Sequence, residues 1–372
     1  MLEEILSSSI QKRVGQLFFI GLPGPEINVE TRNLIEHISP GGICLFARNI
    51  RTPSQTRRLL DEVREILPFK PFISIDQEGG LVDRLRRIIT PMPYPNSIKT
   101  VEEAKQLAKI TAEVLLMLGF NMNFAPVVDV IGEERKKFTN GLYSRSFGTY
   151  KEEVALLTGA YLDTLQKNGC LGCIKHFPGL GASETDSHED LPLIELSREE
   201  LFSHELFPYQ KLFQTSHVEV VMVAHAAFPL IDLQETTHDG KLLPTSLSYN
   251  FVTRLLRDEL GFEGLVKTDD LEMGAILKDY GIGEACKLAI KAGEDMLSIC
   301  ASPDAVREGY EAVLNAVKKG EITETRINDS LRRIAKLKSK IRKSLPLDDE
   351  RLQILSQNIA ELNKQVNYSY GG

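Results

Sequence analysis

Eight short, apolar and β-rich runs recur along the chain. They are continuously apolar instead of alternating with polar residues, which is typical of parallel strands covered on both faces. The runs span residues 18–21, 41–47, 71–76, 121–127, 170–177, 218–225, 264–269 and 295–299. The pattern therefore predicts eight buried, parallel strands.

Segments with the apolar periodicity of amphipathic helices lie between most of these runs. In residues 52–66, for example, Leu59, Leu60, Val63 and Ile66 form one stripe. Further segments of this kind are residues 101–118, 152–166, 198–213, 246–260, 274–291 and 302–318. Strands that alternate with helices in this way predict an α/β protein built as a single (β/α)8 TIM-type barrel.

A doubly wound open sheet is the second possibility for such a pattern. That fold requires a glycine-rich phosphate turn after an early strand, and neither GxGxxG nor GxxxxGK[ST] occurs in the sequence. The barrel is therefore favoured, with residues 1–345 as one (β/α)8 domain. Beyond Pro346 a helix-like run over 348–366 predicts a short helical appendage, so that residues 346–372 form a C-terminal helical tail.

Two polar, glycine-containing connections are longer than an ordinary loop between a strand and a helix. They span residues 132–150 and 179–197. Loops of this length in a compact domain are usually functional lids or binding loops.

The composition limits the classes of partner. The 372 residues include 44 Lys+Arg and 52 Asp+Glu, which gives a net charge of −8, and the pI is near 5.6. This acidic balance argues against nucleic acid and membrane surfaces as partners. No apolar run approaches the roughly 20 residues that span a bilayer, and the acidic N-terminus does not resemble a signal peptide. We expect a cytoplasmic protein and a monomer.

The five cysteines are an odd number in a large chain, which does not indicate a disulfide framework. Cys170 and Cys173 form a CxxC, but no second cysteine pair or histidine pair lies at zinc spacing. We interpret both as small core residues, and we expect neither a metal nor an organic cofactor.

Ionisable residues follow five successive predicted strands. They are Asp76, Asp129, Lys175 with His176, His225, and Asp269 with Asp270. Catalytic groups of barrel enzymes lie at the C-terminal ends of the strands, and buried charges without partners are costly. The clustering therefore predicts a polar cavity at this face.

Simpler interpretations remain for each of these residues. Asp269 or Thr268 could cap the helix that follows, and Lys175 could form a structural ion pair. The Asp186-Ser187-His188 triplet lies in a loop, where an Asx-turn is the default. A serine nucleophile is excluded because no GxSxG elbow occurs.

Two segments carry a specific resemblance to a known family. KHFPGLGASETDSHEDLP (175–192) resembles the KHFPGHG-x4-DSH signature of bacterial family 3 glycoside hydrolases of the β-N-acetylglucosaminidase (NagZ) type. LLRDELGFEGLVKTDDLEM (255–273) is similar to the segment that carries that family's nucleophile. Shorter matches follow in the family's order: IDQEGGLVDRL (75–85), APVVDV (125–130), SRSFG (144–148), MVAHAAFP (222–229), PTSLS (244–248) and AGEDM (292–296).

The resemblance implies a role for each matching residue. Asp269 is the expected nucleophile, His188 the general acid/base, and Asp186 the residue that orients His188. The expected sugar-binding residues are Asp76, Arg84, Arg145, Lys175 and His176. Leu180 and Leu81 depart from the family pattern, which has His and often Arg at these positions, but neither position is catalytic in the family.

The function implied by the resemblance is a retaining exo-β-N-acetylglucosaminidase. Its expected substrate is GlcNAc-1,6-anhydro-MurNAc, with or without peptide, in peptidoglycan recycling. Histidine is a reasonable proton donor because its ordinary pKa is near 6.5. The alternatives are a family 3 β-glucosidase-like enzyme and an aldolase that forms a Schiff base through Lys175 or Lys267.

Overall fold

A parallel β-barrel forms the centre of the molecule. The computed structural model describes residues 1–136, 141–187 and 189–368. Within these residues, nine parallel strands follow the order β7-β6-β3-β2-β1-β11-β10-β9-β8. The strands are β1 (Phe18–Gly21), β2 (Gly42–Leu45), β3 (Phe72–Ile75), β6 (Met122–Asn123), β7 (Leu171–Gly172), β8 (Ile174–Phe177), β9 (Val220–Val223), β10 (Leu265–Asp270) and β11 (Met296–Ile299).

The two outer strands of this order close the barrel. Only Cys173 separates β7 from β8; β7 pairs with β6, and β8 pairs with β9. They are thus two halves of one predicted run; eight of the nine strands fall within the predicted runs, and β10 extends one residue beyond its run. The run over 121–127 forms only the short β6, because Pro126 has no N–H for a sheet hydrogen bond. The prediction of a (β/α)8 barrel is confirmed.

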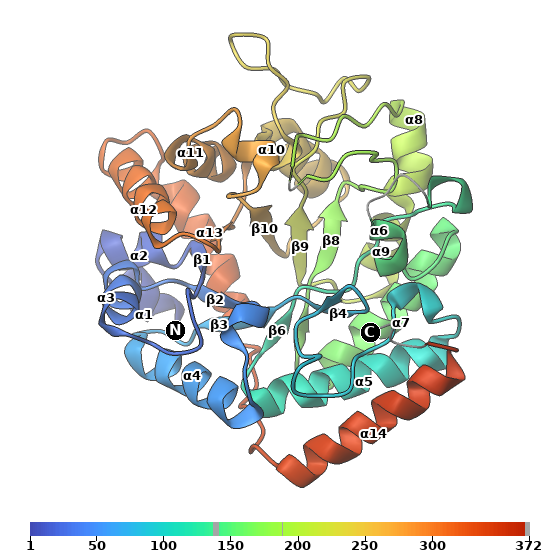
Figure 1. Ribbon diagram of the computed structural model, residues 1–372. Helices are drawn as coiled ribbons and strands as arrows, with labels where there is room; N and C mark the ends of the chain where they lie inside the picture. Colours follow the sequence, from blue (N-terminus) through green and yellow to red (C-terminus); the bar gives the residue numbers. More distant parts are fainter. Residues whose placement is uncertain (137–140, 188, 369–372) are drawn as a thin grey trace.

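Helices surround the barrel (Figure 1). One follows each strand run: α3 (Val29–Ile38), α4 (Pro53–Ile66), α5 (Val101–Leu118), α7 (Lys151–Lys167), α9 (Phe207–Thr215), η6 (Asn250–Glu259), α11 (Ile282–Ala292) and α12 (Pro303–Lys318). Three predicted helices are interrupted. The 246–260 segment divides at Ser248 into η5 (Thr245–Leu247) and η6. The 274–291 segment divides into α10 (Gly274–Leu277) and α11 around Gly281, and the 198–213 segment divides before α9, where Pro208 cannot donate a helical hydrogen bond.

Two short helices, α6 (Leu142–Arg145) and α8 (Arg198–Glu200), lie in connections of the barrel, and four further helices lie at the two ends of the chain. They are α1 (Leu2–Leu6), α2 (Ile10–Gly15), α13 (Glu324–Lys338) and α14 (Asp349–Gln365). Helix α14 lies along α5 and buries Leu352, Leu355 and Ile359 (Figure 1). Arg351 holds it there through two hydrogen bonds of 2.6 and 2.9 Å to the Glu113 carboxylate. The helical appendage is thereby confirmed, whereas the domain boundary at residue 345 stays a prediction.

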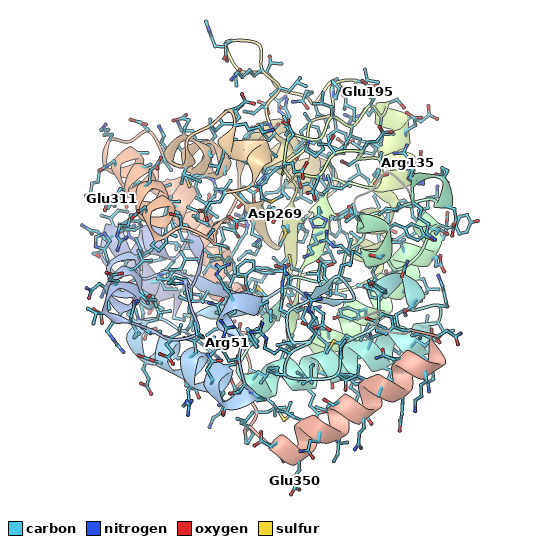
Figure 2. All side chains as sticks on the ribbon, viewed as in Figure 1. Arg51, Arg135, Glu195, Asp269, Glu311 and Glu350 are labelled. Carbon is cyan, nitrogen blue, oxygen red and sulfur yellow. The ribbon has the colours of Figure 1, made fainter. Side chains whose placement is uncertain are left out.

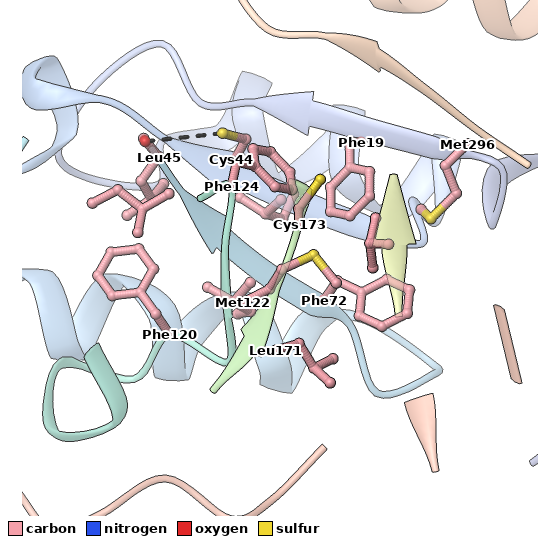
Figure 3. Packing of buried hydrophobic residues seen from close by; sticks show 14 of the residues in the cluster. Phe19, Cys44, Leu45, Phe72, Phe120, Met122, Phe124, Leu171, Cys173 and Met296 are labelled. Carbon is pink, nitrogen blue, oxygen red and sulfur yellow. Dashed lines mark hydrogen bonds between the residues drawn. The ribbon is translucent and has the colours of Figure 1, made fainter. Parts of the chain in front are cut away.

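Apolar side chains fill the interior of the barrel near the N-terminal ends of the strands. Figure 3 shows Phe19, Phe72, Met122, Phe124 and Met296 packed together, with Cys173 among them. All five cysteines are free and buried, as the core-residue interpretation of Cys170 and Cys173 predicts. No helix in the described part of the chain is both long enough and apolar enough to span a membrane.

Candidate active site

A cavity of about 210 Å³ opens at the C-terminal ends of the barrel strands. Figure 2 shows Asp269 near the middle of this face, at the end of β10. The cavity lining includes seven of the eight site residues expected from the sequence: Asp76, Arg84, Arg145, Lys175, His176, Asp186 and Asp269. The eighth, His188, lies outside the described residues. The sequence-based expectation of a polar cavity at this face is confirmed.

Lys175 is the centre of a buried ion network in this cavity. Its Nζ lies 2.6 Å from Asp76 Oδ1 and 2.6 Å from Glu78 Oε1. Arg145 donates two hydrogen bonds to the same Glu78 carboxylate, at 2.7 and 2.9 Å. Lys175 therefore does form an ion pair, as the simpler interpretation held, but it does so inside the cavity, where the network fixes its position.

The charges of this network are mutually stabilised. Burial alone raises the pKa of Glu78, but Arg145 and Lys175 outweigh it, so that this pKa is lowered from its ordinary value. Burial lowers the pKa of Lys175, but Asp76 and Glu78 outweigh it and raise this pKa. The pKa of Arg145 is raised in the same way by Glu78. All three groups are therefore charged at neutral pH.

Glu78 is the site residue that the sequence analysis missed. It follows β3 in a short antiparallel hairpin of β4 (Gln77–Gly79) and β5 (Val82–Asp83), which holds it inside the cavity. The available signal was its place in the DQE triplet directly after a predicted strand. The same hairpin leads into Arg84, whose guanidinium lies 5.7 Å from the Phe46 ring centroid at the cavity wall.

A second buried pair orients His176. Its Nδ1 lies 2.7 Å from Oδ2 of the fully buried Asp129. The other Asp129 oxygen accepts a hydrogen bond of 2.8 Å from the Leu180 backbone N–H. Asp129 thus links the imidazole to the loop that begins at Pro178, and Leu180 lines the cavity at the position where the family pattern has histidine.

Asp269 combines a half-buried position with cationic neighbours. Burial raises its pKa, but His176, His225, Lys267 and Lys175 outweigh burial and hold this pKa well below its ordinary value. The carboxylate is therefore ionised at neutral pH. Its Oδ1 accepts a hydrogen bond of 2.8 Å from the backbone N–H of Asp270.

Neither Asp269 nor Thr268 caps the next helix. Helix α10 begins after Met273, and no side chain caps it. The Thr268 hydroxyl instead accepts a hydrogen bond of 3.0 Å from the Ser298 backbone N–H on the neighbouring strand β11. The capping interpretation is therefore wrong, and Asp269 is left facing the cavity.

Asp270 differs sharply from Asp269. Burial, with added repulsion from Glu272 and Asp269, raises its pKa to about 7. Its Oδ1 accepts a hydrogen bond of 3.1 Å from the Glu272 backbone N–H, and its backbone oxygen lies 3.0 Å from His225 Nε2. Two adjacent carboxyl groups in one cavity thus have pKa values moved in opposite directions.

The loop of residues 179–197 is held against the element that follows Asp269. The Ser187 carbonyl accepts a hydrogen bond of 3.2 Å from Ala275 N–H of α10. Two residues after position 188, Asp190 forms an ion pair of 2.7 Å with Lys278. Both contacts flank position 188, and Asp186 lines the cavity. The loop predicted to be functional is thus anchored beside β10.

The (β/α)8 fold and the polar cavity together define a barrel enzyme, with its active site at the C-terminal ends of the strands. The model of the glycosyl hydrolase family 3 N terminal domain matches residues 9–337. The chain belongs to glycosyl hydrolase family 3. The prediction of a glycoside hydrolase similar to the β-N-acetylglucosaminidases of this family is confirmed.

Curated relatives and solved structures agree with this assignment. A β-hexosaminidase of Pseudomonas aeruginosa (strain LESB58) is 32% identical over 311 residues, which are 82% of this chain and 87% of the relative. A β-hexosaminidase of Haemophilus influenzae is 29% identical and covers 93% of this chain and 96% of the relative. The structure of a family 3 β-N-acetylglucosaminidase from Paenibacillus sp. FPU-7 superposes with a TM-score of 0.85 at 34% identity, over 96% of this chain and 69% of that one.

Proposed function

We propose that the protein is a retaining exo-β-N-acetylglucosaminidase. Its proposed substrate is GlcNAc-1,6-anhydro-MurNAc, with or without its peptide, in the cytoplasmic recycling of peptidoglycan. The observation that carries the proposal is the state of Asp269: an ionised carboxylate at a rigid strand end, facing a cavity lined with groups that can bind hydroxyls.

The reaction takes place in two steps. In the first, Asp269 attacks C1 of the sugar and the bond from C1 to the leaving oxygen breaks, while His188 gives its proton to that oxygen. In the second, water attacks C1 and gives a proton to His188, and the bond from C1 to Asp269 breaks, which regenerates the carboxylate. Asp186 orients the His188 ring and stabilises its protonated form, as the aspartate of hydrolase triads does.

The residues of the ion network bind the sugar. Asp76 accepts hydrogen bonds from hydroxyls, and Arg84, Arg145 and Lys175 donate to hydroxyl or carbonyl oxygens, with His176 beside them. Because Glu78 and Asp129 already hold three of these side chains, little further ordering is required when the sugar binds. A cavity of about 210 Å³ is small beside the roughly 300–1,000 Å³ of pockets for drug-sized ligands, which favours one terminal sugar unit and hence exo cleavage.

The aldolase alternative has less support. A Schiff-base lysine must lose its proton to attack a carbonyl, but Asp76 and Glu78 raise the pKa of Lys175 above its ordinary value. The β-glucosidase-like alternative differs in the sugar rather than in the nucleophile. Activity measurements therefore decide between the two sugars.

The test is the release of p-nitrophenol from its β-GlcNAc and β-glucose glycosides by the wild type and by Asp269→Asn. We expect cleavage of the GlcNAc glycoside only, and its loss in the variant. Preference for glucose contradicts the proposed sugar, and a fully active variant contradicts the proposed nucleophile. Release of GlcNAc from purified GlcNAc-1,6-anhydro-MurNAc, with and without peptide, then tests the cell-wall substrate.

A further inference from the structure

Lys267 lies inside the barrel directly before the proposed nucleophile. It is 1% exposed, and its Nζ donates a hydrogen bond of 2.6 Å to the Thr268 carbonyl oxygen. The ammonium lies 4.3 Å from the ring centroid of Phe124 and 5.9 Å from that of Phe19; Figure 3 shows both rings. Among the described residues, no carboxylate lies within ion-pair distance of Lys267.

A buried ammonium held only by a carbonyl and aromatic faces is unusual, because desolvation disfavours the charged group. The two rings that contact Lys267 are apolar, and a side chain such as Met or Leu would pack against them without a buried charge. Packing alone therefore gives no reason for a lysine at this position.

The geometry connects Lys267 to Asp269. Both side chains line the same cavity, although the pairing of β10 with β11 is irregular between Lys267 and Asp270. The Thr268 carbonyl that Lys267 binds belongs to the peptide group that leads into Asp269, so the ammonium also restrains the backbone at the nucleophile. Lys267 is one of the four groups whose positive charge lowers the pKa of Asp269.

Lys267 also interacts electrostatically with Glu294, just before β11. Both its carboxyl oxygens are buried without a hydrogen-bond partner in the described part of the chain. Burial raises the pKa of Glu294 well above its ordinary value, which favours the neutral form. Glu294 therefore does not neutralise the charge of Lys267. The remaining ionisable groups around Lys267 and Asp269 are Lys175, His176, His225, Asp270, Cys173 and Cys300.

We propose that Lys267 is a positioning residue that stabilises the Asp269 carboxylate each time it is released from the glycosyl-enzyme. The inference rests on the proposed role of Asp269 as nucleophile. When the bond from C1 to Asp269 forms, the negative charge of the carboxylate is lost, and a nearby cation does not assist that change. When water attacks C1 and the bond breaks, the charge returns beside Lys267, which favours the breakage. Lys267 therefore accelerates the second step selectively.

The test removes the positive charge of Lys267 while keeping the approximate shape of its side chain. Lys267→Met retains an unbranched side chain, and Lys267→Arg retains the charge. With an activated aryl β-GlcNAc substrate, we expect Lys267→Met to lower kcat about tenfold and KM in parallel, while kcat/KM stays within about threefold of wild type. Intact-mass spectrometry during turnover should show the variant carrying one covalently bound GlcNAc. Lys267→Arg should restore most of kcat.

A matched control comes from Lys338, another buried lysine, which lies outside the cavity lining. Its Nζ donates a hydrogen bond of 2.6 Å to Gln16 Oε1 and lies 5.4 Å from the Phe72 ring centroid. Burial lowers the pKa of Lys338 to about 7, and Lys338→Met removes a buried amine of the same length, but it should neither accumulate the intermediate nor lower kcat and KM together. The control thereby separates the local effect from a general effect on folding.

Each outcome decides the inference. A folded Lys267→Met enzyme with unchanged kcat and no bound sugar overturns it, as does a fall in kcat/KM without accumulation, which indicates a structural role. If Lys267→Met does not fold, Lys267→Gln must show the same accumulation. If Asp269→Asn is inactive and Lys267→Met behaves as wild type, only the role of Lys267 is wrong. If Asp269→Asn is fully active, the proposed nucleophile is wrong as well.

Discussion

Two aspartates on neighbouring strands illustrate how one residue type serves stability at one end of the barrel and chemistry at the other. Asp295, just before β11, is fully buried. Its Oδ2 accepts hydrogen bonds from Arg257 at 2.7 Å and Val266 N at 3.1 Å. Its Oδ1 accepts from Ser330 at 2.7 Å and Arg333 at 3.1 Å. Asp295 thus connects a strand, η6 and α13.

Asp269, near the end of β10, has far fewer direct partners. Among the described residues, it accepts one hydrogen bond, from the Asp270 backbone N–H. Cationic side chains lower its pKa from a distance instead of occupying its oxygens. A carboxylate whose oxygens are all bonded stabilises the fold, whereas one that is ionised but sparsely bonded is available to attack a substrate. The difference lies in the number of partners and not in burial alone.

The largest expected effect is on activity and comes from replacing Asp269. Asp269→Asn should lower kcat on the order of 10⁴-fold or more, because an amide cannot form the glycosyl ester. The variant should stay folded, with a thermal unfolding midpoint somewhat below that of wild type at neutral pH, because the carboxylate no longer offsets the positive charges that lower its pKa. Steady-state assays with p-nitrophenyl β-GlcNAc, together with a thermal melt, measure both quantities. Substantial activity in a carefully purified variant contradicts the assignment.

The next effect concerns the proposed proton donor. His188→Ala should slow substrates with poor leaving groups by about 10²–10⁴-fold and activated aryl glycosides much less. The measurement is kcat/KM over a series of leaving groups. Asp186→Ala should shift the pH–rate profile, because Asp186 stabilises the protonated ring. An equal loss across leaving groups assigns the histidine a structural role instead.

The stabilising side of the comparison is tested by Asp295→Asn. Removing one member of a buried ion network leaves Arg257 and Arg333 without their counter-charge, and we expect a loss of about 3–5 kcal/mol in the free energy of unfolding. Activity per folded molecule should remain near wild type, because Asp295 lies at the opposite end of the strands. Chemical denaturation followed by circular dichroism measures the loss. An Asp295→Asn protein that is stable but inactive contradicts this division of roles.

The smallest effect concerns Asp270, whose pKa in the fold is about 7. In the unfolded chain this carboxyl ionises near its ordinary pKa of about 3.9. A raised pKa in the folded state means that ionisation opposes folding, so the penalty is absent below pH 4, grows between pH 4 and 7, and is complete above pH 7. Asp270→Asn should therefore melt a few degrees higher than wild type at pH 8 and equally at pH 4.

The same variant tests the identity of the proton donor. If His188 donates the proton, the basic limb of the pH–rate profile remains after Asp270→Asn. Loss of this limb in the variant assigns the proton to Asp270.

The fold was largely predictable because each strand is covered on both faces and is therefore continuously apolar. Details that depend on neighbouring strands could not be predicted from the sequence. The break at Cys173 follows from pairing across the barrel. Likewise, the division of the segment before Pro208 depends on a local backbone bond that apolar periodicity does not report.

The site was predictable where residues lie at strand ends or in family motifs. Seven of the eight expected residues line one cavity. Glu78 was missed because its role depends on Lys175 and Arg145, which are distant in sequence and meet it only through barrel closure and the β4–β5 hairpin. The opposite pKa shifts of Asp269 and Asp270 are equally invisible in a TDD triplet, because they arise from the surroundings of each side chain.

The most direct test of the account is to trap the covalent intermediate. A 5-fluoro derivative of β-N-acetylglucosaminyl fluoride slows both steps but supplies a good leaving group, so the glycosyl-enzyme accumulates. Proteolysis and tandem mass spectrometry then locate the bound sugar. We predict a single labelled residue, Asp269. A label on Asp270, Asp76 or another side chain, or steady turnover with no covalent adduct, contradicts the central claim.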